Sequence, residues 1–177
     1  MVKKSTLFFG YSAVFILMLL YFLPKVSLFY FAEEKLKPLG VIFSKEKLYD
    51  KGFTLRIEDT TLFVKSIESA KIASVEITPF LLYNSVDVKG VELSKTLKSF
   101  IPLHIEEILV DHSVLSPTTL YAEVSGDFGE AEVTFDIVQK RVHLKLEPSQ
   151  KMLQEYKSTL REFKKEEDGG YSYDANL

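Results

Sequence analysis

The sequence predicts an α+β protein with one N-terminal transmembrane helix, a mainly antiparallel, curved β-sheet domain and a C-terminal amphipathic helix. Three observations predict this fold class. The chain begins with an uncharged apolar run, its middle alternates apolar and polar residues, and near its end apolar residues recur about every 3.6 positions. These patterns are typical of a membrane span, of half-buried strands and of a helix with one apolar face.

The apolar run covers residues 5–24 and reads STLFFGYSAVFILMLLYFLP, without a charged side chain. A helix of about 20 residues rises about 30 Å, which matches the hydrocarbon core of a bilayer. We therefore expect residues 5–24 to form a transmembrane anchor. The apolar side chains expected to face lipid are Leu7, Phe8, Phe9, Val14, Phe15, Ile16, Leu17, Leu19, Leu20, Phe22 and Leu23.

A removable signal peptide and a buried core helix are the alternatives to an uncleaved anchor. The apolar run is longer than that of a signal peptide, and Tyr30 is bulky where a cleavage after Ala32 would need a small residue. An all-apolar helix of this length has no place inside a domain of about 150 residues. Both observations favour the anchor.

The lysines near the apolar run indicate its orientation. Lys3 and Lys4 precede it, whereas Lys25 follows it and the next lysines are mixed with Glu33 and Glu34. Basic residues favour the cytoplasmic side of a membrane. We therefore expect residues 1–4 in the cytoplasm and the C-terminal domain in the periplasm, as in a single-pass protein of the inner (cytoplasmic) membrane.

Residues 25–39 are rich in helix formers and predict a juxtamembrane helix that continues the anchor, until Pro38 and Gly40 end it. A continuous helix over residues 5–37 would be about 48 Å long, which exceeds the bilayer core. Its last turns must therefore emerge and lie on the membrane surface or on the domain.

Residues 40–148 predict the antiparallel β domain, with roughly eight short strands joined by short turns. Residues 53–58 and 71–78 alternate clearly, and a bulge is expected at Gly90. We expect residues 62–67 to form a separate strand of the meander. The side chains expected to point inward in the two alternating segments are Phe53, Leu55, Ile57, Ala73, Val75 and Ile77.

Residues 149–168 predict the amphipathic helix, with Ser149 as its N-cap. Its apolar stripe would dock on an open face of the sheet or lie on a membrane. Residues 169–177 form a tail that is either loose or an added edge strand. The docking stripe consists of Met152, Leu153, Tyr156, Leu160 and Phe163.

Composition excludes several classes of protein. The chain has 177 residues, a formal net charge of −3 and no cysteine. The charge gives no basic surface for nucleic acid. The lack of cysteine excludes disulfide scaffolds, thiolate metal sites and cysteine nucleophiles.

The short motifs in the sequence lack the context that catalysis requires. Residues 127–129 spell DFG, and residues 44–47 fit S-x-x-K, but the partner motifs of kinases and of penicillin-binding enzymes are missing. His104, His112 and His143 have no metal-ligand spacing. The paired acids at 33–34, 106–107 and 166–167 resemble solvated faces. We expect no enzyme activity, no cofactor and no metal.

Two segments carry a resemblance to a known family. Residues 73–94 read ASVEITPFLLYNSVDVKGVELS, a strand ending in Thr-Pro, an apolar corner and a strand of the form V-x-V-x-G-V-x-L. This resembles a unit near the start of AsmA-type envelope proteins and of type II secretion system protein N. The strand, helix and G-x-Y finish of residues 147–177 is similar to that of the secretion N-type proteins. The resemblance implies a Gram-negative envelope protein of secretion or lipid-related biogenesis and transfers no site residues.

Three functions remain open at this point. The first is a non-catalytic adaptor or assembly component of cell-envelope secretion, with membrane lipid and other envelope or secretion proteins as partners. The second is a lipid-binding or lipid-transfer module at the inner membrane, which requires an under-filled apolar face on the curved sheet. The third is a membrane-bound hydrolase, which requires clustered acids or histidines.

Overall fold

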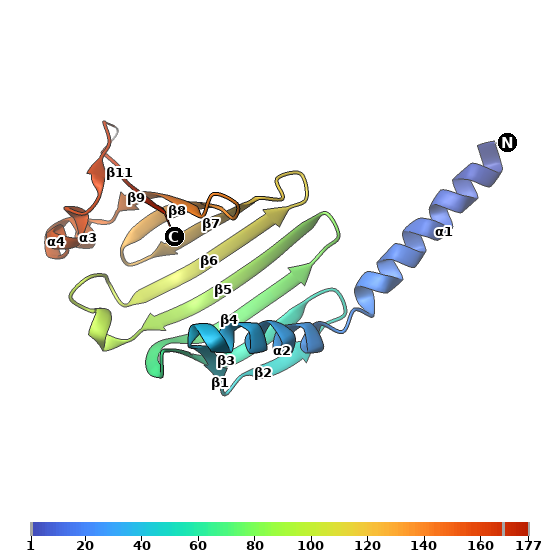
Figure 1. Ribbon diagram of the computed structural model, residues 1–177, viewed down its shortest axis with the longest axis horizontal. Coiled ribbons are helices and arrows are strands. Elements are labelled where there is room, and N and C mark those ends of the chain that lie inside the picture. Colours follow the sequence, from blue (N-terminus) through green and yellow to red (C-terminus); the bar gives the residue numbers. More distant parts are fainter. Residues whose placement is uncertain (1, 168, 177) are drawn as a thin grey trace.

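A computed structural model of the chain describes residues 2–167 and 169–176. A long curved antiparallel sheet fills its centre, with α1 (Val2–Tyr21) projecting from one end and the C-terminal helices at the other (Figure 1). This confirms the α+β class with a large antiparallel sheet. Met1, Asp168 and Leu177, assigned above to the cytoplasmic segment, the C-terminal helix and the tail, lie outside the described residues.

The apolar run forms α1, but the predicted continuous helix is wrong. A second helix, α2 (Lys25–Leu36), follows after a break and leads into the 3-10 turn η1 (Lys37–Leu39). Pro24 explains the break, because it lacks an N–H and its ring disfavours helical backbone at the preceding Leu23. Phe22 and Leu23, expected within the anchor, therefore lie between the two helices.

Within the described residues, no single helix is both long and apolar enough to count as a candidate membrane span. The pair Thr6–Tyr21 and Lys25–Leu39 meets the criteria of length and composition only when taken together, with a 56° bend between its members. From Leu7 onward, the large apolar side chains of α1 are exposed, except for the buried Leu20.

The described strands form one 11-stranded antiparallel sheet in the order β1-β3-β4-β5-β6-β7-β8-β9-β11-β10, and β2 pairs with the half of β3 that β1 leaves free. The prediction from the sequence was roughly eight strands. That prediction divided β3 into two strands and did not define β10 and β11. The strands are β1 (Val41–Ser44), β2 (Lys47–Asp50), β3 (Leu55–Val64), β4 (Ile67–Pro79), β5 (Tyr83–Leu93), β6 (His104–Ser113), β7 (Thr119–Gly126), β8 (Gly129–Asp136), β9 (Arg141–Pro148), β10 (Lys164–Lys165) and β11 (Tyr171–Asn176).

Four adjacent strands are kinked along one line across the sheet. Residues of a strand that share one face are normally two positions apart, but at the kink they are three positions apart. The alternation between the two faces of the sheet therefore shifts by one residue at this line. Asp59 in β3 and Gly90 in β5 have positive φ, and a Cβ on Gly90 would meet the Cβ of Ala73 at 2.9 Å. The expected bulge at Gly90 is wrong, because the pairing of β5 with β4 and β6 continues in the same register on both sides of it, and Gly90 instead lies at the kink. Ala73 is exposed rather than inward. The separated pairs are Ile57 and Thr60, Ile72 and Val75, Val88 and Val91, and Ile105 and Ile108.

The C-terminal segment differs from the single helix predicted over 149–168. It forms two short helices, α3 (Gln150–Glu155) and α4 (Lys157–Leu160), because Tyr156 leaves helical geometry with φ −117° and ψ 32°. The chain then enters β10 and β11. The described part of the tail is therefore an added strand, since β11 pairs with β9 along its whole length.

The closed core lies where α3 and α4 meet one end of the sheet. Met152, Tyr156 and Leu160 are buried there, and Leu153 and Phe163 pack partly against them. Their partners from the sheet and its turns are Ala70, Val91, Ile105, Phe128, Ala131 and Leu146. Only this end of the sheet is covered by the C-terminal helices (Figure 1).

Along the edge of the sheet that β1 and β2 form, α2 contacts both of these strands. The rings of Phe29 and Phe43 lie 5.9 Å apart. The buried Lys25 Nζ lies 3.4 Å from Asp50 Oδ1 and donates to the carbonyls of Tyr21 and Leu23. The bend between α1 and α2 is thus tied to β2 by a charge pair.

Candidate functional site

One face of the sheet carries two adjacent rows of apolar side chains that cross eight strands without a polar residue. Directly paired residues on antiparallel strands point to the same face, so the register defines the rows. The first row is Ile57, Val75, Val88, Ile108, Val124, Ala131, Leu146 and Tyr171. The second is Leu55, Ile77, Val86, Val110, Ala122, Val133, Leu144 and Tyr173.

Helices cover these rows only at the two margins. Leu55 and Ile57 lie in the half of β3 that pairs with β2, a strand that α2 contacts, and they are 1% and 2% exposed. Leu146, in the strand β9 that α3 contacts, is also buried. Eight strands span about 38 Å at their usual spacing, whereas each helix is about 10 Å wide. The centre of the rows is therefore left uncovered by the described elements.

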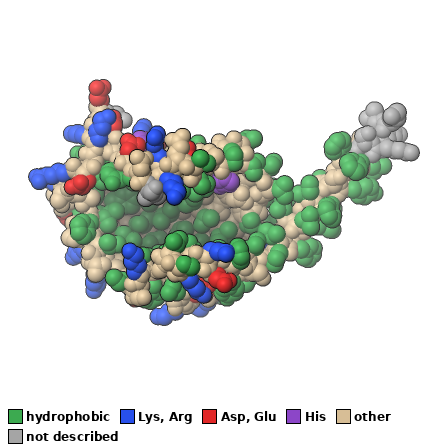
Figure 2. All heavy atoms as spheres, in the orientation of Figure 1, with side chains coloured by type: hydrophobic (Ala, Val, Ile, Leu, Met, Phe, Trp, Pro, Cys, Tyr) green, Lys and Arg blue, Asp and Glu red, His purple; other side chains and the backbone are tan. Residues whose placement is uncertain are grey.

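We call this central part the apolar trough. All its residues are half-buried, and they are Val75, Ile77, Val86, Val88, Ile108, Val110, Ala122, Val124 and Val133. Figure 2 shows the hollow between the two margins, lined by hydrophobic side chains. Such a surface offers contact to an apolar chain and little to a polar ligand, because none of the nine trough side chains can form a hydrogen bond.

A groove of about 720 Å³ over β6–β9 is lined both by acidic residues and by Val124, Ala131, Leu146 and Tyr171 of the first apolar row. Leu153 of α3 and Glu166, Gly169 and Gly170 also line it. The ionisable residues lining it are Glu107, Glu123, Glu130, Glu132, Lys145, Glu147 and Glu166. The acidic side chains distinguish this groove from the apolar trough, and Val124 lines both.

One carboxylate of the groove, that of Glu107, is paired with Lys89. Lys89 Nζ lies 2.8 Å from Glu107 Oε1, and its hydrogen bond lowers the pKa of Glu107. A lowered pKa keeps the carboxylate ionised, which is the opposite of what a general acid needs near neutral pH. The hydrogen bond from Lys89 therefore does not prepare Glu107 for the role of a general acid.

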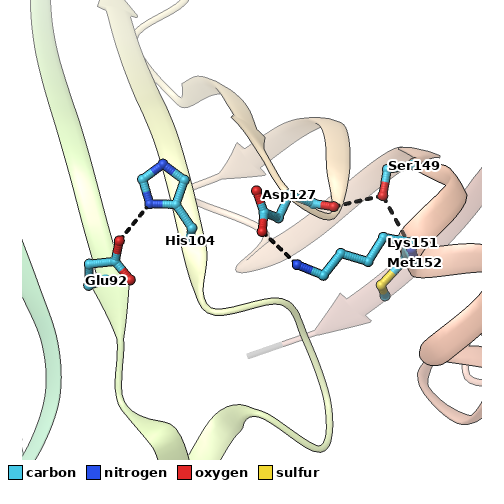
Figure 3. Close-up of polar contacts among 6 residues, drawn as sticks. All are labelled: Glu92, His104, Asp127, Ser149, Lys151 and Met152. Carbon is cyan, nitrogen blue, oxygen red and sulfur yellow. Dashed lines mark hydrogen bonds and ion pairs between the residues drawn. The ribbon is translucent and has the colours of Figure 1, made fainter.

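The three histidines do not converge. His104 and His112 lie near opposite ends of β6, about 26 Å apart at the usual rise per residue. His104 pairs with Glu92 at 2.8 Å (Figure 3), and His143 pairs with Asp174 at 2.9 Å. The described residues contain no group of three or more side chains placed to hold a metal ion. The hydrolase hypothesis thus gains no site from these histidines.

The DFG triplet forms a turn that anchors α3. Ser149 Oγ donates to the carbonyl of Asp127 at 2.7 Å and accepts from the N–H of Met152 at 3.2 Å (Figure 3). Lys151 Nζ lies 2.7 Å from Asp127 Oδ2. Ser149 is therefore the predicted N-cap, and Asp127 serves the packing of α3.

Replacing Lys151 with methionine should raise the pKa of Asp127, because the hydrogen bond from Lys151 is the main cause that lowers it. A lowered folded-state pKa stabilises the fold above the unfolded value of about 3.9 and stops doing so as the pH falls through the folded value. We expect K151M to be slightly less stable than the parent at pH 7, since both side chains are exposed, and the difference to vanish as the pH falls below the folded-state pKa of Asp127.

Carboxyl NMR titration and urea unfolding in micelles measure these two effects. K71M is the matched control, because Lys71 lies 3.7 Å from Glu68 on the surface and far along the chain from Asp127. An Asp127 pKa that K151M leaves unchanged would contradict the assignment.

Sequence reasoning named two of the trough residues, Val75 and Ile77, as inward, but it did not predict that the trough lies uncovered. One feature of the sequence could have predicted that part of this face is uncovered. Alternating apolar residues recur in every strand from β3 to β9, whereas the only helical stripes near the sheet are short. A single stripe of five side chains cannot cover eight strands. The solid core beneath α3 and α4 counts against the lipid hypothesis at that end of the sheet, whereas the centre of the two rows is left uncovered by the described elements.

Comparisons of the chain with models of protein families, with curated proteins and with solved structures find no match.

Proposed function

We propose that the protein is a membrane-anchored, non-catalytic module whose apolar trough holds the acyl chain of a membrane lipid. The observation that carries the proposal is the pair of unbroken apolar rows left uncovered between α2 and α3. The trough crosses the five strands β4–β8, which span about 19 Å at the usual spacing between strands. That length exceeds one bilayer leaflet of about 15 Å of hydrocarbon, so a whole acyl chain fits within it.

The anchor in this proposal is α1. Its exposed apolar side chains, such as Phe9, Phe15 and Leu19, have no packing partner that would explain them in water among the described residues. The lysines before the apolar run favour an N-terminus in the cytoplasm and a sheet in the periplasm. An inner-membrane location would bring the trough to its lipid.

A second candidate is an adaptor of cell-envelope secretion, related to AsmA-type proteins or to type II secretion protein N. One observation favours it. Beyond the short pairing with β10, the described part of β11 from 173 to 176 leaves its outer edge open. An open edge can accept a strand from another protein.

Filling the trough tests the lipid proposal. Ala122 lies on the trough floor, whereas its neighbour Glu123 points to the opposite face and is exposed. We expect a fatty acid with a photoreactive diazirine to label peptides of β5–β8 in the full chain. The label should be lost in A122W and kept in E123W.

Peptide mass spectrometry after crosslinking gives the readout. Labelling confined to α1, with no peptide from the sheet, would overturn the lipid proposal while leaving the anchor in place. Circular dichroism spectra that match the parent's would show that A122W retains its sheet.

A further inference from the structure

The turns at the two ends of the sheet differ in character. An antiparallel meander returns at alternate ends, so the β4–β5, β6–β7 and β8–β9 connections share one end, and the β3–β4, β5–β6 and β7–β8 connections share the other. The first set consists of exposed apolar tips: Phe80, Leu81, Leu82, Val114, Leu115, Ile137 and Val138. The second set also exposes Ile67 and Phe100, but intersperses them with Lys65, Lys95, Lys98 and Asp127.

The three apolar tips form one continuous surface. The N–H of Val114 donates to the carbonyl of Leu82 at 3.1 Å and joins the first tip to the second. The N–H of Ile137 donates to the carbonyl of Thr118 at 2.8 Å and joins the third tip to the second. We call these seven residues the apolar tip surface.

The tips are ordered with their apolar side chains outward. Asp136 Oδ1 accepts from the N–H groups of Val138 and Gln139, which fixes the third tip in a tight turn. Ser113 Oγ accepts from the N–H of Leu115 in the same way. Leu115 is 91% exposed and Val138 is 73% exposed. These side chains are thus held in solvent by local hydrogen bonds.

The apolar tip surface lies at the end of the sheet from which α1 leaves (Figure 1). Tyr21, the last residue of α1, stacks edge-on against Phe53 in the β2–β3 turn of this end, with ring centroids 5.3 Å apart. The end of the apolar helix is therefore fixed beside the tips. If α1 enters a bilayer, the tips face the surface of that bilayer.

We propose that the apolar tip surface docks on the lipid bilayer beside α1 and inserts its side chains into the interfacial region. The first two tips, residues 79–83 and 114–118, contain no charged residue, which suits the headgroup boundary and does not suit a polar protein partner. Tyr83 flanks the first tip, and tyrosine is enriched at membrane interfaces. Docking makes the end of the sheet that carries the three tips face lipid. The side of the trough nearest to the tips then faces lipid as well.

This inference rests on the anchoring part of the proposed function, but it does not depend on what occupies the trough. The chain contains no cysteine, so a single introduced cysteine can carry an environment-sensitive NBD fluorophore. The full chain is reconstituted in phosphatidylcholine vesicles, with and without brominated acyl chains as quenchers. Labels go to Leu81→Cys, Leu115→Cys and Val138→Cys, with Ser66→Cys and Thr96→Cys as exposed controls at the other end.

We expect blue-shifted emission and loss of most of the signal to brominated lipid at the three tips, and neither effect at Ser66→Cys and Thr96→Cys. Phe15→Cys in α1 reports on the anchor separately. Quenching at Phe15→Cys with water-like emission at the tips would overturn the inference and leave the anchor intact. Blue-shifted tips that brominated lipid does not quench would also overturn it, because a protein surface would then cover them.

Discussion

Replacing Gly129 with alanine should destabilise the C-terminal end of the sheet by about 3 kcal/mol or more. Gly129 has φ +118°, and a Cβ there would lie 2.1 Å from the carbonyl oxygen of Glu147 and 2.7 Å from the N of Ser149. Both are backbone atoms at the junction of β9 and α3, so neither can move without shifting the α3 helix. The closed core around Met152 would loosen as a result.

Gly169 provides the matched control for this substitution. It also has positive φ, at +91°, but a Cβ there meets no atom within 4 Å. G169A should therefore cost only the backbone strain, about 1–2 kcal/mol. Urea unfolding in micelles, followed by tyrosine fluorescence, compares the two variants. Equal losses of stability would contradict the packing argument at Gly129.

Local patterns made much of this fold predictable from the sequence. Apolar residues at every second position identified most of the sheet, because a strand with one buried face must alternate apolar and polar side chains. The Ser149 cap and the stop at Pro38 and Gly40 each depend on a few adjacent residues. Such features need no knowledge of what packs against them.

Features that depend on distant partners were not predictable in this way. Ala73 fits an alternating pattern, yet the kink it shares with β5 turns it outward. The stripe from Met152 to Phe163 has a helical period, yet the helix breaks at Tyr156. In both cases tertiary packing decided between local conformations of similar energy.

The candidate site also combines features that local sequence patterns predict with features that depend on distant partners. Each strand's apolar positions could be read from the sequence, but the trough exists because the covering helices are too few and too short. The apolar tips follow from topology, since residues 80–82, 114–115 and 137–138 lie far apart in the sequence and meet only through alternate turns. The sequence alone does not predict that these turns lie at the same end of the sheet, because that depends on the order of the strands.

Replacing Asp50 with asparagine should have the second large effect, because it leaves the Lys25 ammonium without its counter-charge. Lys25 is 2% exposed, and the two residues are 25 positions apart in the sequence. Loss of one partner of a fully buried pair costs about 3–5 kcal/mol. Here we expect about 2 kcal/mol, since Asp50 is 38% exposed and Lys25 retains its bonds to two carbonyls.

The same variant should loosen the bend between α1 and α2. Spin labels at Tyr11→Cys and Ser66→Cys report the distance between α1 and the sheet, and D50N should broaden its distribution. K25M removes the buried charge itself and should cost less than D50N. D59N is the matched control, because the exposed pair of Lys47 and Asp59, with 2.7 Å between Nζ and Oδ2, should contribute less than about 1 kcal/mol. A distance distribution in D50N as narrow as that in D59N would show that the charge pair does not hold α1 in place.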